Sequence, residues 1–516
     1  MNEPGQSYSR VVPARPSNNA VGGEVAQTQT AAEAAEERRL AKGNTDGTAR
    51  SGRRTGRRVS PGLDRVREAA ERDREARFTT LLHHVDTDCL RAAYRALRAG
   101  AAAGVDGVTW EAYGEDLEAN LEDLRRRLHS GAYRAKPVRR VYIPKGDGRR
   151  RPLGVTSLED KIVQGAIVGV LNSIYEVDFL GFSYGFRPGR SPHQALDALV
   201  TGIKTRKVNW VFDADIHDFF GSLDQGCLRM FLEHRIGDRR VLRLIQKWLN
   251  AGVVENGAWA EFDQGTPQGA VISALLANVY LHYVFDQWAN RWRRRQAQGD
   301  MVVVRYADDF IVGFEHKGDA ERFQADLSER LAKFGLGLQA GKTRLIQFGR
   351  FAAQMRARWG LGKPETFDFL GFTHICGKAR SRRFKVTRIT VSKRMRGQLH
   401  ELKGEIEQRR HQPIPEQGQR LKSVVQGHLN YYAVPGNLRR VETFRQQVKR
   451  YWLQALQRRS QRAGMAWARF EHLVRRWLPT VRNMHPYPES RFYATHPRQE
   501  PSAVVPHAGV CAGGRP

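Results

Sequence analysis

Two adjacent acids, Asp308 and Asp309, interrupt an otherwise apolar stretch at Val302–Phe314. The residues on either side are rich in β-branched and aromatic types and predict two strands, with the small Ala307 and the two aspartates in a tight turn between them. Neighbouring carboxylates repel each other and are costly to remove from water unless a positive charge lies beside them. A divalent metal ion would supply that charge. The alternative is an exposed turn without chemistry, because aspartate is common in turns.

A second apolar stretch, Val208–Ile216, also predicts a strand and also contains acids. Asp213 and Asp215 are two residues apart, so their side chains share one face of that strand. If this strand and the acidic hairpin are neighbours in one sheet, Asp215 joins the adjacent pair. Two divalent ions about 3.5–4 Å apart among three carboxylates would support in-line phosphoryl transfer. Carboxylates suit Mg²⁺, a hard cation that prefers oxygen ligands.

A basic hairpin is expected earlier in the chain. Short strands flank Gly146-Asp147-Gly148, which is typical of a hairpin turn, so Lys145 and Arg151 should lie close together on opposite strands. This hairpin is suited to binding a triphosphate, and solvated surface charge is the equally open alternative. Gln268 stands where a loop with Gly and Pro leads into an apolar helix, which would present its amide from rigid backbone.

The 516 residues carry a formal net charge of +31, from 85 Lys and Arg against 54 Asp and Glu. A charge of this size predicts attraction to a polyanion, and nucleic acid is the favoured partner. No apolar run reaches membrane-spanning length and the N-terminal residues have no apolar signal core, so we expect a cytoplasmic or nucleoid-associated protein with no membrane partner. The four cysteines form no CxxC pair, which argues against a zinc site or a disulfide framework.

The ends of the chain differ in composition from its middle. Residues 1–60 have few large apolar side chains and predict a disordered basic arm. Beyond about residue 375, basic residues interleave with aromatic ones, and helices are predicted around Met395–Arg410, Gln419–Ala433 and Leu438–Arg462. Such faces suit contacts with RNA, while a helical bundle that uses most of its Trp side chains as core is the alternative. Residues 489–516 predict a flexible tail.

Taken together, the motifs resemble those of the reverse transcriptases encoded by bacterial group II introns. YADD follows DADI and QGTPQG in the family's order, and GKTRL and FLGF come after it. GVDGVT, IPKGDGRRRPLG and YGFRPGRSPHQAL resemble earlier blocks, and QGHLNYYAVPGN at Gln426–Asn437 is similar to part of the thumb and maturase region called domain X. The resemblance extends over roughly Phe78 to Pro488 and outweighs the interpretation of the acid pair as a simple turn.

This resemblance implies an α+β fold of the right-hand polymerase type, with fingers and a palm built on an antiparallel sheet and followed by an α-helical thumb. The implied division places an N-terminal extension and fingers in 61–205, the palm with its catalytic site in 206–375, and the thumb and maturase domain in 376–488. The arm 1–60 and the tail 489–516 would lie outside these domains.

By the same resemblance, Asp215, Asp308 and Asp309 would be the catalytic residues and would hold two Mg²⁺ ions. Lys145 and Arg151 would contact the incoming triphosphate.

Two further residues would shape the nucleotide site. Gln268 would touch the nucleotide near its sugar, and Phe220 stands where the family places an aromatic ring that excludes a 2′-hydroxyl and favours deoxynucleotides. The chain departs from the family pattern at His217, Gly221, Ala270 and Ala274, where Lys, Asp, Gly and Pro are usual. An alanine at a glycine position is expected to strain the nucleotide pocket.

The resemblance implies an RNA-directed DNA polymerase of a mobile group II intron that is also a maturase. Its partners would be intron RNA, an RNA template with a DNA primer, deoxynucleoside triphosphates and target DNA. The C-terminal part lacks the Cys pair and His-Asn-His pattern of the endonuclease found in some relatives, so another primer such as nascent DNA is expected. Two alternatives are an RNA-binding splicing cofactor with an inactive polymerase site and a reverse transcriptase used outside introns.

Overall fold

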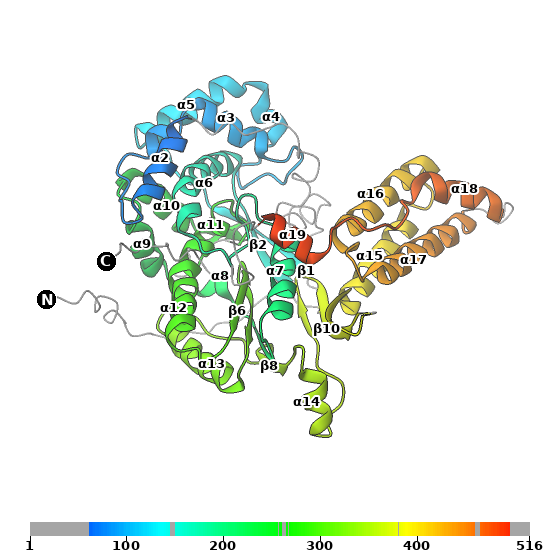
Figure 1. Cartoon of the computed structure of the whole chain (residues 1–516). Helices are drawn as coiled ribbons and strands as arrows, with labels where there is room; N and C mark the ends of the chain where they lie inside the picture. The colour runs from blue at the N-terminus through cyan, green and yellow to red at the C-terminus, as the bar shows by residue number, and fades with distance from the viewer. Residues whose placement is uncertain are drawn as a thin grey trace.

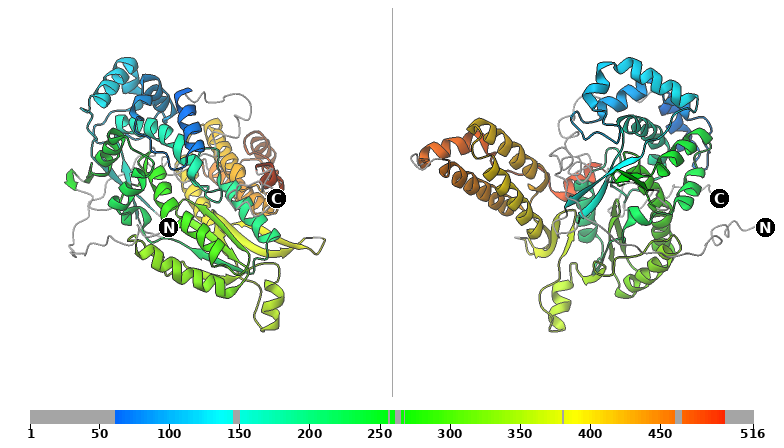
Figure 2. Two further views of the ribbon diagram at one scale, coloured as in Figure 1. Left: turned by 60° about the vertical axis from the view of Figure 1, so that its left-hand side comes forward. Right: turned by 180° about the vertical axis from the view of Figure 1, so that it is seen from behind.

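The structure, a computed structural model, describes residues 61–144, 150–255, 257–260, 265–266, 268–379, 381–459 and 465–495. These residues form three β-sheets surrounded by helices, which confirms the expectation of a mixed α+β fold. Figures 1 and 2 show N-terminal helices at one end of a body that contains the sheets, with a helical bundle standing beside it. The predicted arm 1–60 and Lys145 lie outside the described residues.

The central sheet carries the acids predicted to do chemistry. Its antiparallel strands lie in the order β6 (Met301–Tyr306), β7 (Asp309–Phe314), β3 (Trp210–Ala214) and β8 (Arg344–Gln347). Every residue of β6 is buried, as is every residue of β7 after Asp309. Helices α7 (Pro192–Thr205) and α13 (Lys317–Ala332) pack against it. The acidic hairpin and the predicted strand before it are therefore neighbours in one buried sheet.

Two smaller sheets are also present in the described chain. One has the order β2 (Arg150–Val155), β1 (Val138–Pro144), β4 (Val253–Glu255) and β5 (Ala258–Ala260), and the other contains β9 (Phe367–Phe369), β10 (Phe372–Lys378) and β11 (Phe384–Thr390). Strands β1 and β2 pair antiparallel, as predicted for the basic hairpin. The domain boundary expected after residue 375 falls inside β10, so this strand joins the segments on either side of it.

Helices connect and cover the sheets. The N-terminal helices are α2 (Pro61–Arg72), η1 (Leu82–His84), α3 (Thr87–Ala96), α4 (Trp110–Glu115), α5 (Leu117–His129) and α6 (Leu158–Asp178). Between the strands lie α8 (Phe219–Ser222), α9 (Gln225–Glu233), α10 (Arg239–Leu249), α11 (Ser273–Leu281), α12 (Gln287–Arg295) and α14 (Ala352–Arg358). A π-helical turn at His282–Asp286 links α11 to α12 without a break. None of the helices within the described ranges is long and apolar enough to cross a lipid bilayer.

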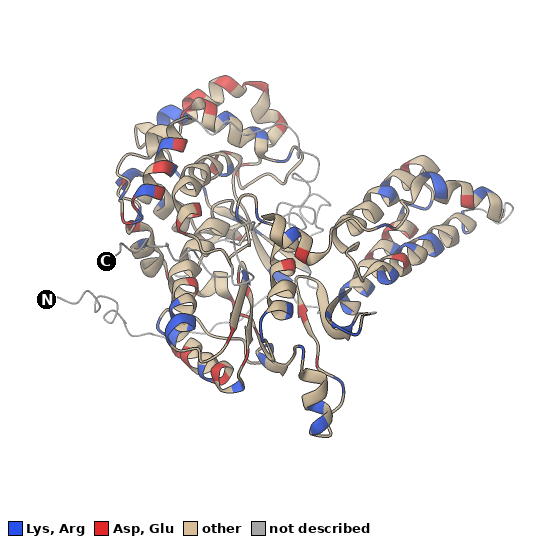
Figure 3. Ribbon diagram, viewed as in Figure 1, with Lys and Arg blue, Asp and Glu red and all other residues tan. Residues whose placement is uncertain are grey.

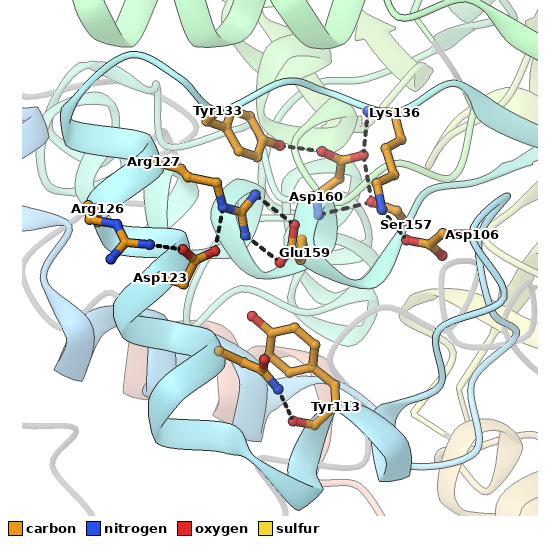
Figure 4. A network of polar contacts seen from close by, with 11 residues as sticks. Asp106, Tyr113, Asp123, Arg126, Arg127, Tyr133, Lys136, Ser157, Glu159 and Asp160 are labelled. Carbon is orange, nitrogen blue, oxygen red and sulfur yellow. Dashed lines mark hydrogen bonds and ion pairs between the residues drawn. The ribbon is translucent and has the colours of Figure 1, made fainter.

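A buried polar cluster fixes the start of α6 to the loop that precedes β1 (Figure 4). Ser157 caps α6, its Oγ accepting from the Asp160 N–H at 3.2 Å. The Asp160 carboxylate accepts from the Ser157 hydroxyl at 2.7 Å, from the Lys136 N–H at 3.2 Å and from the Tyr133 hydroxyl. Burial raises the pKa of Asp160, and these three donors satisfy the carboxyl group. Gly104 of the GVDGVT motif packs so closely against Ser157 that a Cβ on Gly104 would lie 2.5 Å from the Ser157 Cα.

The C-terminal helices are α15 (Ser392–Gln408), α16 (Ile414–Tyr432), α17 (Leu438–Gln457) and α18 (Trp467–Trp477), which form the bundle in Figure 1. Trp452 is fully buried in this bundle, as expected for a core side chain, whereas Trp467 is 59% exposed.

The prediction of a flexible tail from residue 489 is wrong for its first residues. Helix α19 (Pro488–Thr495) packs on α7, as Figure 1 shows beside the central sheet. Phe492 is buried, and the Arg491 guanidinium lies 3.3 Å from the Asp197 carboxylate on α7. The partners of α19 lie almost three hundred residues away in sequence, so local composition gave no sign of them.

Candidate active site

The turn between β6 and β7 places the two adjacent acids at its tip. Tyr306 and Asp309 pair across the hairpin, with Ala307 and Asp308 between them. Ala307 has a φ of +57°. A left-handed backbone costs a residue other than glycine about 1–2 kcal/mol, so contacts around the turn must hold it in this conformation.

The register of β3 against β7 places Asp215 beside this turn. The last pair of the ladder joins Ala214 to Phe310. Asp215 follows Ala214 and Asp309 precedes Phe310, so the two acids occupy the next opposed position, just past the end of β3. Opposed residues in antiparallel strands project to the same face, with Cβ atoms about 4.5–5.5 Å apart.

The pKa values of the two adjacent acids, Asp308 and Asp309, are raised. The surrounding protein displaces part of the water around the Asp308 and Asp309 carboxyls, and this desolvation is the main cause of the raised pKa of each. The negative charge of Asp215 raises the pKa of both further, and Asp308 adds to the effect on Asp309. The Asp309 side chain still reaches solvent at the mouth of the site. Asp308 and Asp309 are therefore stabilised either by bound protons or by a nearby cation.

Lys342 supplies one positive charge, because its ammonium group pairs with the Asp215 carboxylate. The Lys342 side chain is 54% exposed and that of Asp215 is 20% exposed. Among the described residues, no three His, Cys, Asp or Glu side chains are placed closely enough to form a ready metal-binding group. The donors of this site are nevertheless carboxylate oxygens whose charges repel one another, and that chemistry fits a hard divalent cation.

Asp213, which shares the strand with the acid of the site, has a different partner. Its carboxylate accepts from the Arg344 guanidinium at 3.0 Å, and in the ladder it stands opposite Ile311. Burial raises the pKa of Asp213. Pairing with Arg344 sets this acid apart from Asp215, although the sequence placed both on one face.

A buried arginine lies beneath the turn. Arg305 and Asp286 are both fully buried and form a two-pronged ion pair with N–O distances of 2.6 and 2.5 Å. Arg305 Nη1 also donates to the Ala307 carbonyl at 2.9 Å and to Asn278 Oδ1 at 3.0 Å. These hydrogen bonds use the donors that desolvation would otherwise leave unpaired. Arg305 thus links Ala307, the left-handed residue of the turn, to the helical segment formed by α11, the π-helical turn and α12.

Two further residues complete this support. Asn278 Nδ2 donates to the Gly185 carbonyl at 2.7 Å. A Cβ on Gly185 would lie 2.2 Å from the Ala307 nitrogen, so the backbone of Gly185 packs directly against the turn. Asp286 is the last residue of the π-helical turn, a feature that often marks functional sites.

Sequence reasoning assigned no role to these supporting residues. Asn278, Asp286 and Arg305 each stand in a run of large apolar side chains, which is the signal that identified the aspartates. Lys342 appeared only as part of the GKTRL motif.

The residues expected to bind the nucleotide lie on connected segments. Arg151 is on β2, close enough for its charge to oppose the rise in the pKa of Asp308. The Gln268 carbonyl accepts from the Gly154 N–H of the same strand at 2.7 Å. Phe220, on α8, is partly buried, and its carbonyl accepts from the Thr266 N–H at 2.9 Å. These backbone hydrogen bonds connect the segments that carry Arg151, Gln268 and Phe220. Lys145 lies outside the described residues.

The structure shows how two of the residues that depart from the family pattern, Gly221 and Ala270, are accommodated. Gly221 leaves room for Asp218, because a Cβ on Gly221 would lie 2.3 Å from Asp218 Oδ2. Ala270 is buried, and its backbone is not left-handed, so the strain expected from alanine at this position is absent.

Comparison with known proteins identifies the central part of the chain. Residues 143–374 match the family described as reverse transcriptase (RNA-dependent DNA polymerase). This range contains the whole central sheet and all the acids described above.

Several named relatives share this part of the chain. Protein YkfC of Escherichia coli strain K12 is 35% identical over 238 residues, which cover 40% of this chain and 62% of that protein. Group II intron-encoded protein LtrA of Lactococcus lactis subsp. cremoris is 34% identical over 222 residues, covering 43% and 37%. The putative COX1/OXI3 intron 1 protein of Saccharomyces cerevisiae is 26% identical over 306 residues, covering 50% and 36%. The chain thus spans about a third to three-fifths of the length of these relatives.

Proposed function

We propose that the chain is an RNA-directed DNA polymerase of a group II intron, because residues 143–374 match the reverse transcriptase family and the chain is similar to a group II intron-encoded protein. It would extend a DNA primer on an RNA template with deoxynucleoside triphosphates. The observation that carries this proposal is the register that places Asp215 beside the Asp308–Asp309 turn at the end of a buried sheet.

Asp215, Asp308 and Asp309 would hold two Mg²⁺ ions. When bound, such ions lower the pKa of an attacking hydroxyl and neutralise the oxygens of the leaving group. The carboxylates must be unprotonated for this role, and the raised pKa values of Asp308 and Asp309 make protons effective competitors at those two groups. Lys342 must release Asp215 before all three carboxylates face one cation.

The chain's own residues would position the nucleotide. Arg151, near Asp308, would neutralise charge on the triphosphate, and we propose that Lys145 does the same. Gln268 would contact the nucleotide near its sugar. The Phe220 ring would exclude a 2′-hydroxyl, because Phe220 is held against the core and cannot easily move aside. Arg305 would fix the turn without touching the substrate.

The domains would follow the right-hand arrangement of polymerases. We propose an N-terminal extension and fingers at 61–205, a palm at 206–375 around the central sheet, and a thumb and maturase domain at 376–488. The palm would position the reacting groups, while the helical bundle in the last range would bind intron RNA and assist splicing. The same protein would then act on target DNA during intron mobility, in the cytoplasm or on the nucleoid.

Primer extension tests the polymerase proposal directly. Purified protein with Mg²⁺, a DNA primer annealed to an RNA template and deoxynucleoside triphosphates should lengthen the primer. Asp308→Ala should reduce extension by at least about 10³-fold, since it removes a group that acts with the other acids as a unit. Asp88→Ala, which changes an acid on α3, is the matched control and should remain active.

Filter binding to intron RNA separates loss of chemistry from loss of folding. Asp308→Ala should bind this RNA as tightly as the unchanged protein does. An unchanged protein that binds intron RNA but extends no primer would contradict the polymerase proposal and leave an RNA-binding splicing cofactor as the function.

A further inference from the structure

A helical projection extends from the body between β8 and β9. We define the α14 projection as residues 350–364, which include α14 and the loop that follows it. Figure 1 shows it pointing away from the central sheet, and the view from behind in Figure 2 shows the same separation. Neither the acids nor the nucleotide-binding candidates lie on it.

The base of the projection is firmly attached. Ala352 is fully buried, and a Cβ on the preceding Gly349 would lie 1.9 Å from the Val208 carbonyl oxygen. Arg350 donates to the Lys204 carbonyl at 3.0 Å. Arg356 closes the loop by pairing with Glu365 at 3.2 Å and donating to the Gly362 carbonyl at 3.1 Å. The α14 projection is therefore a structured element that is held by its own hydrogen bonds and ion pair.

The outer surface of the projection exposes large apolar side chains. Phe351 is 46% exposed, Trp359 59% and Leu361 47%. Three such residues within a short segment are more than the single exposed apolar side chains that are normal on a surface, and such groupings mark interaction sites. Within the described chain, no ring or cation contact covers the Trp359 indole.

The charged residues of the α14 projection are all basic. Residues 350–364 contain Arg350, Arg356, Arg358 and Lys363 and no Asp or Glu. Arg358 and Lys363 are exposed. Figure 3 shows basic residues toward the end of this helix that lies farther from the body. A partner that fits this surface must therefore be negatively charged.

An exposed indole lies beside Arg358 and Lys363, which have no ion pair within the described part of the chain. This combination fits single-stranded nucleotides better than it fits protein. Bases that are not paired stack on aromatic rings, and Arg and Lys contact the adjoining phosphates. A protein partner would have to bury Arg358 and Lys363 next to the apolar residues, which is costly without matched acids.

We propose that the α14 projection binds an unpaired stretch of RNA, with Trp359 stacked on a base and with Arg358 and Lys363 on phosphates. The choice of RNA rests on the proposed function, and the contact lies outside the polymerase site. It would let the protein hold a folded RNA while the central site is occupied by primer and template.

Fluorescence anisotropy with a labelled RNA hairpin that has an unpaired uridine loop tests this contact. The full chain is first saturated with an unlabelled RNA template and a dideoxy-terminated DNA primer, so that the polymerase site is filled. Trp359→Ala should then weaken hairpin binding about fivefold to tenfold, and Trp359→Phe should restore most of it because a ring remains. Gln354→Ala, an uncharged change on the same exposed helix, is the control and should bind normally.

Two further measurements locate the contact. Arg358→Ala should make the slope of log affinity against log salt shallower by about 0.7, the value for one phosphate contact on a single strand. RNA carrying 5-iodouridine in the loop should crosslink to the peptide containing Trp359. Primer extension on a short homopolymer template should be unchanged in these variants, so failure of this proposal is distinguishable from failure of the proposed function.

Binding by Trp359→Ala that equals binding by the unchanged protein would overturn the proposal. So would a crosslink confined to other peptides. Self-association of the unchanged chain that Trp359→Ala abolishes, with RNA affinity unaffected, would also overturn it by showing that the projection is a protein contact.

Discussion

Two cation–carboxylate pairs flank the same acidic turn, and they differ in burial. Arg305 and Asp286 are fully buried beneath the turn and share two hydrogen bonds. Lys342 and Asp215 meet at the open side, where the lysine is 54% exposed. Removing one partner of a buried pair is strongly destabilising, whereas an exposed pair contributes about 0–1 kcal/mol. The first pair is therefore fixed, and the second can exchange with another cation.

The identity of each cation suits this difference. The planar guanidinium of Arg305 binds both Asp286 oxygens and still reaches the Ala307 carbonyl. The ammonium of Lys342 is a hydrated point charge on a flexible stem, which can leave Asp215 at little cost.

Asp286→Leu tests the buried pair and should have the largest effect. It leaves the Arg305 guanidinium buried without a counter-charge, which costs about 3–5 kcal/mol. The apparent Tm, followed by circular dichroism, should fall by about 3–5 °C in a chain of this length. Lys342→Met should change it by less than about 2 °C, and the double variant Asp286→Leu/Arg305→Met should regain part of the loss. Equal shifts for Asp286→Leu and Lys342→Met would remove the distinction between the pairs.

Gly185→Ala tests whether the buried support controls chemistry. The added Cβ would lie 2.2 Å from the Ala307 nitrogen and should displace the turn without removing any of the acids. Misplacement by about 1 Å can reduce a rate 10²-fold, so kcat for primer extension should fall by about that factor. Gly169→Ala in α6, where nothing lies within 4 Å of an added Cβ, is the matched control. Similar kcat values for the two variants would show that the turn tolerates displacement.

Lys342→Met tests the exchangeable pair. Without the competing ammonium group, Asp215 is available to a cation, so the Mg²⁺ concentration for half-maximal extension should fall roughly twofold to fivefold. The concentration midpoint is measured separately from the maximal rate. A midpoint that stays the same or rises would show that Lys342 does not compete for Asp215.

The raised pKa values of Asp308 and Asp309 predict how pH acts on this side of the site. At low, fixed Mg²⁺, extension should decline as the pH falls into the raised pKa range, because protonated carboxyls do not bind the cation. Excess Mg²⁺ should move the midpoint to lower pH, since the cation binds the unprotonated form. A pH profile insensitive to Mg²⁺ would contradict competition between protons and the cation.

The smallest predicted effect is that of Asp309→Asn on the thermal stability of the protein in the absence of divalent ions. Because the pKa of Asp309 is raised by folding, the folded chain binds more protons than the unfolded chain above the ordinary aspartate range, so its stability falls as pH rises through the raised pKa. Asp309→Asn removes this loss and should raise the Tm by about 2 °C near pH 8. No gain over the unchanged protein, in thermal melts with chelator, would mean that solvent screens the charge of Asp309.

Much of the acidic site was readable from residue types. Aspartates standing in β-branched and aromatic runs predicted the hairpin at Ala307 and a strand over Val208–Ile216, which the structure shows to end at Ala214. Arg305, Asp286 and Asn278 gave the same kind of signal but remained without a role. Their partners lie on a strand and a helix whose approach no short-range pattern reveals.

The sequence by itself determined the acidic hairpin, the basic hairpin and the strand that carries Asp213, and it showed that the chain carries a large positive charge. These features follow from local preferences and from charge, which need no knowledge of distant segments. Only the tertiary structure decided that Asp215 opposes Asp309 while Asp213 pairs with Arg344, and that Arg305 rather than Lys342 is buried. Register and burial depend on how distant elements pack, and the free energy of an ion pair depends on that burial.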